Sequence, residues 1–226
     1  MNYDFKNSNA SRELLIELLA SFVENASSVS NSVCLSQFKK MWDEHLAYGI
    51  YQENIHIISL TNQYFPLEHS FFSNYFVIYF HVQGLQSIIS DKIVPSSSVP
   101  LSKIKDRIHY TKHDSYSLHD DALNTPIVVV QMYSTNAKGE LCMGEVVDGN
   151  HRVSAANNLN IDIPITVLET EMLPSDAFRN ETSWILYHLI TGIQIISGGL
   201  FTIDQIDSYL KRLSSLLLCY LPLKSE

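Results

Sequence analysis

The stretch VVDGNHRVSAA, residues 146–156, decides the fold prediction, because it changes from a strand pattern to a helix pattern at one glycine. The strand ends at Asp148, and Gly149 lets the backbone turn sharply or approach a ligand closely. Asn150 belongs to the residue types that cap helices. Val153, Ala155 and Ala156 then give the next segment a short apolar helical face. We therefore expect a strand, a tight loop and a helix in direct succession.

The same loop carries side chains that suit an anionic ligand. Unpaired N–H groups in the first turn of a helix lie at the positive end of its dipole and can bind a phosphate. Arg152 would add a bidentate cation, and His151 a donor or a proton shuttle near neutral pH. Asp148 could act as a base or hold a metal ion. A purely conformational role for the loop is the alternative, with Arg152 paired to a carboxylate such as Glu145.

The flanking sequence extends this unit in both directions. Residues 126–133 are apolar and β-branched and predict a buried strand, and residues 140–147 predict its hairpin partner after a turn at 135–139. Residues 161–167 alternate between apolar and polar and predict a half-buried strand, with Pro164 indicating a sheet edge. Residues 93–101, with two prolines, predict an extended edge or connector. The order of elements indicates a compact α+β unit.

Residues 146–156 together with the strand at 161–167 resemble the D-G-x-H-R-x-x-A-A signature of the ParB/sulfiredoxin-like superfamily, over about residues 93–169. This resemblance implies a small mixed-sheet core whose loop and following helix bind nucleotide phosphates. Members of the superfamily include CTP hydrolases, sulfiredoxins, an ADP-dependent serine kinase, nuclease-annotated proteins and toxins that transfer ADP-ribose. A shared fold does not select among these activities.

Departures from the superfamily pattern narrow the choice. Sulfiredoxins have a reactive cysteine where this chain has Asn150, which excludes repair of sulfinic acid. Partitioning ParB proteins carry a G-E-R-R type loop and a DNA-reading helix, and this chain has neither pattern. The aspartate resembles the kinase-like branch, which makes Asp148 the best catalytic candidate. A Fic-type AMP transferase is disfavoured, because Gly144 stands where its motif needs a histidine and His151 replaces its second glycine.

A second group of polar residues lies upstream of the loop. It could supply metal ligands or form a solvated loop, which we favour, and it comprises His109, His113, Asp114, His119, Asp120 and Asp121. Lys103, Lys105 and Arg107 precede it and could form a second cationic wall for phosphates or the charged surface of an amphipathic helix.

Helical segments are predicted on both sides of the core. They cover residues 11–24, 36–47 and 68–89, then a helix capped by Ser175 or Asp176 that runs to about residue 196, and another that begins with a capping box at 202–205. We accordingly expect an N-terminal helical region at 1–90, the superfamily-like core at 91–170, and C-terminal helices at 171–226 packed on the core.

Composition limits the kinds of partner. The net charge of −9 makes nucleic acid an improbable partner, because binding its phosphates needs a basic face. The most apolar stretch, residues 71–82, is shorter than the about 18–20 residues that span a bilayer. The three cysteines lie far apart, which fits a reducing compartment. We expect a cytoplasmic protein, with a secreted effector as the alternative.

These observations lead to one functional expectation and two alternatives. The first is a kinase- or NTPase-like enzyme that cleaves or transfers at a phosphate-linked bond, using ATP, ADP, CTP or NAD, with Mg²⁺ as a candidate cofactor. Asp148 and His151 would be catalytic, and Gly149, Asn150, His151 and Arg152 would bind the nucleotide. The alternatives are an NAD-dependent ADP-ribosyltransferase acting on a protein substrate and a non-enzymatic, nucleotide-gated interaction protein.

Overall fold

The computed structural model is a mixed α and β structure. It describes residues 17, 20, 21, 24, 36, 37, 39, 40, 63–71, 74–91, 96–112, 127–135, 141–169, 173–197 and 202–220. The chain divides into two compact units, of which one is His81–Leu173 and the other combines Met1–Phe80 with Pro174–Glu226. All residues of the predicted loop site lie in the unit His81–Leu173.

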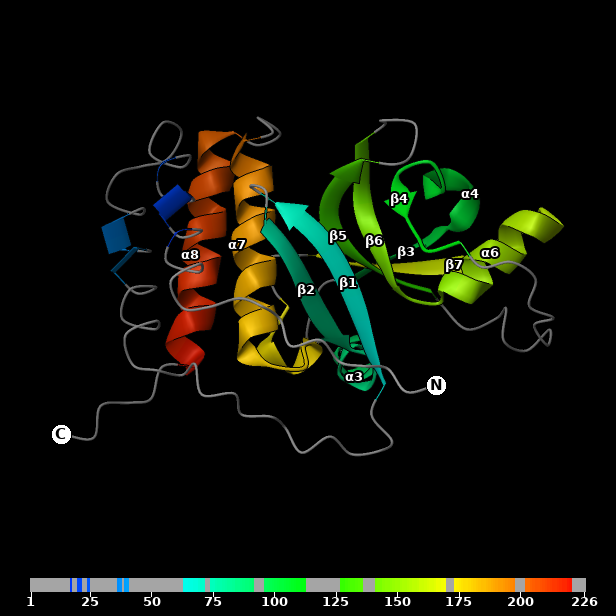
Figure 1. Ribbon diagram of the computed structural model, residues 1–226, viewed down its shortest axis with the longest axis horizontal. Helices are drawn as coiled ribbons and strands as arrows, with labels where there is room; N and C mark the ends of the chain where they lie inside the picture. Colours follow the sequence, from blue (N-terminus) through cyan, green and yellow to red (C-terminus); the bar gives the residue numbers. More distant parts are fainter. Residues whose placement is uncertain are drawn as a thin grey trace. The chain divides into compact units, whose positions relative to one another are not determined.

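A five-stranded mixed sheet forms the centre of the unit His81–Leu173 (Figure 1). Its strands, in sheet order, are β3 (Ser96–Pro100), β7 (Pro164–Leu168), β5 (Ile127–Thr135), β6 (Leu141–Asp148) and β4 (Ile108–His109). β5 runs antiparallel to β6 and parallel to β7, while β3 is antiparallel to β7 and β4 is parallel to β6. The predicted hairpin of two strands and the predicted extended edge are thus confirmed.

Two helices cover one face of this sheet. They are α6 (Asn150–Leu159) and the single turn α4 (Leu101–Ile104), and Figure 1 shows both on the same side of β5 and β6. The apolar core between helices and sheet contains Leu101, Ile108, Ile127, Val129, Val146, Val153, Ala156, Ile163 and Ile165. A third helix of the unit is α3 (Val82–Ser90), which buries Val82, Leu85 and Ile88. The predicted helix after the loop is confirmed by α6.

Pro164 does not mark a sheet edge, which corrects the prediction. β7 lies between β3 and β5, and Pro164 is its first residue, paired in register with Pro100 of β3. The first position of a strand tolerates proline, because the missing N–H group lies where pairing only begins. The edge strands are β3 and β4 instead.

The predicted helix at residues 68–89 is wrong over 68–71 and 74–81 and is confirmed only over 82–89. The structure has β1 (Tyr64–Phe71) and β2 (Asn74–His81), which form a two-stranded sheet, and the helix α3 begins only at Val82. The five consecutive residues from Phe76 to Phe80 are all buried. A continuous apolar run of this kind has no periodicity that separates a doubly buried strand from a helix, and its aromatic and β-branched residues favour strands.

The unit that combines Met1–Phe80 with Pro174–Glu226 contains two long helices, α7 (Glu181–Ser197) and α8 (Ile203–Tyr220), which lie side by side in Figure 1. The predicted capping box is confirmed at α8, since the N–H groups of Thr202 and Gln205 bond to each other's side chains. The predicted cap of α7 is wrong. Asn180 accepts a hydrogen bond from the Ser183 N–H group at 2.8 Å, and the residues proposed as caps lie in the short 3-10 helix η2 (Ser175–Ala177).

Several predictions concern residues outside the described part of the chain. Of the predicted helices at 11–24 and 36–47, the structure describes residues 17, 20, 21, 24, 36, 37, 39 and 40, all of them helical. The rest of these two helices, the upstream polar residues from His113 to Asp121 and residues 136–139 of the predicted turn lie outside it. Among the described helices, none combines the length and the apolar character needed to cross a membrane.

Candidate functional site

The turn between β6 and α6 is made by Gly149 in the left-handed conformation. Its φ is 97° and its ψ is 20°, and it occupies the N-cap position of α6 without a capping side chain. A Cβ atom at this position would lie 2.8 Å from Nη2 of Arg152 and 3.0 Å from Cγ1 of Ile127. The left-handed backbone conformation therefore favours glycine here, and the missing Cβ leaves the room that the guanidinium occupies.

Arg152 folds back over this turn and pairs with Asp148. Its Nη2 lies 3.1 Å from Oδ2 of Asp148, and the two side chains are 12% and 23% exposed. Nε2 of Gln86, on α3, donates a weak hydrogen bond to the same Oδ2 at 3.5 Å. The pairing of Arg152 with a carboxylate, which the conformational alternative predicted with Glu145 as its example, is thus observed with Asp148. A mostly buried cation and a carboxylate thus meet at the first turn of α6.

Asn150 does not cap α6, which corrects the prediction for its side chain. It is the first residue of the helix and is 6% exposed. Its Oδ1 accepts a hydrogen bond from the Thr111 N–H group at 2.8 Å, and its Nδ2 donates to the Val146 carbonyl at 3.0 Å. With both ends of its amide engaged, Asn150 joins the loop to β6 and to the segment after β4. The structure gives its side chain a structural role.

His151 is exposed on the first turn of α6, next to the paired Arg152. Its neighbourhood is therefore open to solvent, unlike that of Asn150. Two roles predicted for the loop thus separate in space, since the exposed imidazole can meet a ligand while the Asn150 amide holds the backbone.

Sequence reasoning missed a second pair, between His109 and Glu145. Nδ1 of His109 lies 2.8 Å from Oε2 of Glu145, and the side chains are 48% and 5% exposed. The two residues are register partners in the neighbouring strands β4 and β6. The hydrogen bond to Glu145 raises the pKa of His109 above its ordinary value, burial opposes the rise, and the carboxylate charge adds to it. Both residues were noticed in the sequence, but for other roles.

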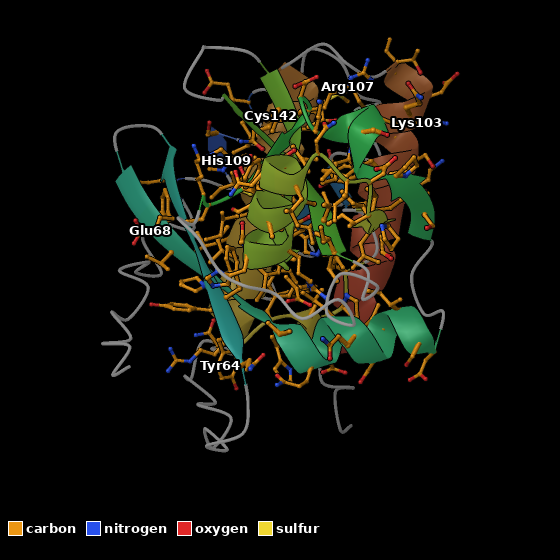
Figure 2. All side chains as sticks on the ribbon, turned by 90° about the vertical axis from the view of Figure 1, so that its right-hand side faces the viewer. Tyr64, Glu68, Lys103, Arg107, His109 and Cys142 are labelled. Carbon is orange, nitrogen blue, oxygen red and sulfur yellow. The ribbon has the colours of Figure 1, made fainter. Side chains whose placement is uncertain are left out.

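The other upstream residues do not join this site as far as the structure describes them. Lys103, Lys105 and Arg107 are exposed, and Figure 2 shows the labelled Lys103 and Arg107 apart from His109. Lys103 lies in the four-residue α4, and Lys105 and Arg107 follow it, so the amphipathic helix proposed for all three is wrong. Of the predicted metal-ligand group only His109 lies in the described part, and no three His, Cys, Asp or Glu side chains gather there. Cys142 is a buried cysteine of β6.

None of the protein-family models, curated proteins and solved structures compared with this chain gives a significant match. The resemblance to the ParB/sulfiredoxin-like superfamily therefore stays a prediction. The candidate site rests on its geometry.

Proposed function

We propose that this protein is a nucleotide-binding enzyme that cleaves or transfers at a phosphate-linked bond, with the loop Asp148, Gly149, Asn150, His151 and Arg152 as its site. The observation that carries the proposal is the position of the Arg152 guanidinium, whose Nη2 and Nε would lie within 2.9 Å of a Cβ atom on residue 149. This position brings a cation to the N-terminus of a ten-residue helix. Both features attract a phosphate.

The charges of the loop suggest separate roles for its two ionic residues. Arg152 is already held by Asp148, so binding a phosphate demands little further ordering of its side chain. Asp148 itself opposes binding, because two like charges about 4 Å apart near a protein surface repel by about 4 kcal/mol. A carboxylate that hinders binding and remains 23% exposed is better suited to accept a proton from the attacking water or hydroxyl.

The remaining residues have supporting roles in this proposal. Gly149 leaves room for the guanidinium and lets the backbone approach the ligand, while Asn150 fixes the loop through Thr111 and Val146. His151 would neutralise charge that develops on the phosphate. A Mg²⁺ ion would need only one carboxylate from the protein, because phosphate oxygens of the nucleotide commonly supply further ligands.

A binding and turnover experiment on the full chain tests the proposal. Thermal shift is measured with ATP, ADP, CTP, GTP and NAD, each with and without Mg²⁺, and products are followed by phosphorus NMR. At least one nucleotide should stabilise the wild type, by about 2.7 kcal/mol at 100 times its Kd. Arg152→Ala should weaken binding at least tenfold. Asp148→Asn should keep or improve binding and lose turnover, while the exposed Lys112→Gln control should change neither.

The outcomes separate the competing functions. Equal nucleotide affinity in the wild type and in Arg152→Ala would refute the proposal. Transfer of label from NAD to a protein in a cell lysate would favour the ADP-ribosyltransferase instead. Binding that depends on Arg152 but leads to no turnover of any nucleotide would favour a nucleotide-gated interaction protein.

A further inference from the structure

The pair of His109 and Glu145 has the arrangement of a proton-transfer dyad. The Glu145 side chain is 5% exposed, and the polar contact that the structure gives its carboxylate is the 2.8 Å bond to Nδ1 of His109. Burying a carboxylate is costly, and an apolar side chain of similar size often serves packing better. The free-energy cost of burying the Glu145 carboxylate is understandable where this group has to orient a reactive imidazole, that of His109.

The bond to Glu145 fixes the tautomer of the ring. A carboxylate accepts hydrogen bonds, so Nδ1 carries the proton in this pair. The ring's other nitrogen, Nε2, has no protein partner among the described residues, and 48% of the side chain is exposed. The His109 side chain can therefore exchange a proton at Nε2 with a ligand or with water. The described titratable group against the ring is Glu145, and the exposed Arg107 and Lys112 are the nearest charges on its own segment.

The buried amide of Asn150 connects this pair to the loop. It accepts from the N–H group of Thr111, two residues after His109, and it donates to the carbonyl of Val146, the residue after Glu145. Asp148 lies three residues after Glu145 on the same strand, and a register shift leaves their partners in β5 only two residues apart, a separation of roughly 7 Å. The two β5 partners are alternate residues, so both carboxylates lie on the same face of the sheet, and one phosphoryl group bound there can meet both pairs.

We propose that His109 is a further catalytic residue, the general acid of the site, and that Glu145 is its positioning residue. This inference rests on the proposed function. The oxygen of water or of an acceptor hydroxyl attacks the phosphorus and forms a new P–O bond while its proton passes to the Asp148 carboxylate. The P–O bond to the leaving group breaks, its electron pair stays on the leaving oxygen, and that oxygen takes the proton from Nε2 of the His109 imidazolium. Both side chains then return to their starting states by proton exchange with water.

The test uses the full chain, with turnover of ATP, ADP, CTP, GTP and NAD followed by phosphorus NMR in the presence of Mg²⁺. His109→Gln keeps an N–H donor for Glu145 but cannot transfer a proton, so kcat should fall about 100-fold with KM little changed. Lys112→Gln removes an exposed charge from the same segment and should leave kcat unchanged.

Glu145→Gln distinguishes positioning from a merely structural role. The general acid acts in its protonated form, so the rate falls as pH rises through the pKa of His109. Because Glu145 raises that pKa, the Glu145→Gln variant should lose activity at a lower pH than the wild type. This readout remains available if His109→Gln fails to fold.

Three results would overturn the inference. Turnover that depends on Arg152 but is within twofold of the wild type in His109→Gln refutes the role of His109 and leaves the proposed function intact. An unchanged pH profile in Glu145→Gln refutes the positioning role. A wild type that turns over none of the five nucleotides refutes both this inference and the enzymatic function.

Discussion

The two ionic pairs of the unit His81–Leu173 differ in whether the cation or the carboxylate is the more buried member. In the pair at the loop the cation, Arg152, is the more buried member at 12% exposure, and Asp148 is the more exposed at 23%. In the pair between β4 and β6 the carboxylate of Glu145 is 5% exposed, and the imidazole of His109 is 48% exposed. In each pair the more exposed member is the one to which we assign proton transfer.

In the proposed roles, the two pairs would hold an acid and a base with opposite charges in one unit. A buried partner of opposite sign fixes each reactive group, and exposure decides which member of the pair meets a ligand. Asp148 and Arg152 are four residues apart and depend on one helical turn, whereas His109 and Glu145 depend on the pairing of two strands. Separate changes can therefore break each pair.

The largest expected effect on stability comes from removing the exposed member of the β4–β6 pair. His109→Ala leaves the Glu145 carboxylate buried without its partner and should lower the free energy of unfolding by about 3 kcal/mol at pH 7. Glu145→Gln leaves an exposed imidazole and a side chain that can still form the bond, so it should cost less than about 1 kcal/mol. Urea unfolding of both variants measures the difference, and equal losses would contradict the burial argument.

A smaller effect is expected at the loop pair from changing Gly149. Gly149→Ala should cost about 2 kcal/mol, since an alanine at φ of 97° is strained and its Cβ would displace the Arg152 guanidinium. Gly149→Asn is the matched control, because asparagine tolerates the left-handed conformation but still carries a Cβ atom. Asparagine should cost about half as much as alanine. Thermal unfolding of both variants measures the two losses, and equal losses would show that the left-handed backbone does not contribute to the cost.

The smallest effect is the pH dependence that His109 gives to stability. Its folded-state pKa is raised, so the stabilisation is fully present below the unfolded value of about 6.5 and is lost as pH rises through the folded value. The imidazole is half exposed and solvent screens its charge, so the change should be under about 1 kcal/mol. The wild type should exceed His109→Gln in unfolding free energy by more at pH 6 than at pH 8.5. An opposite slope would show that the pair does not favour the protonated ring.

The loop and its flanking elements were predictable because their information is local. A glycine followed by asparagine and a helical pattern, between strand patterns, defines β6, α6 and β7 within 28 residues, from Leu141 to Leu168. The hairpin of β1 and β2 was not predictable in the same way, because its apolar run has no period. The pairing of His109 with Glu145 joins residues 36 apart through a strand of two residues. No sequence pattern predicts a strand that short.

The edges of the five-stranded sheet have a consequence for how this protein behaves at high concentration. β4 contributes only two residues to one edge, and β3 ends in Pro100 on the other after three serines. Proteins guard against amyloid-like stacking by keeping edge strands short or by placing proline in them. Along the described edge strands of this sheet, few consecutive backbone N–H and C=O groups are available to pair with a strand from another molecule. The apolar strands β5 and β7 are shielded from such growth by their own sheet neighbours.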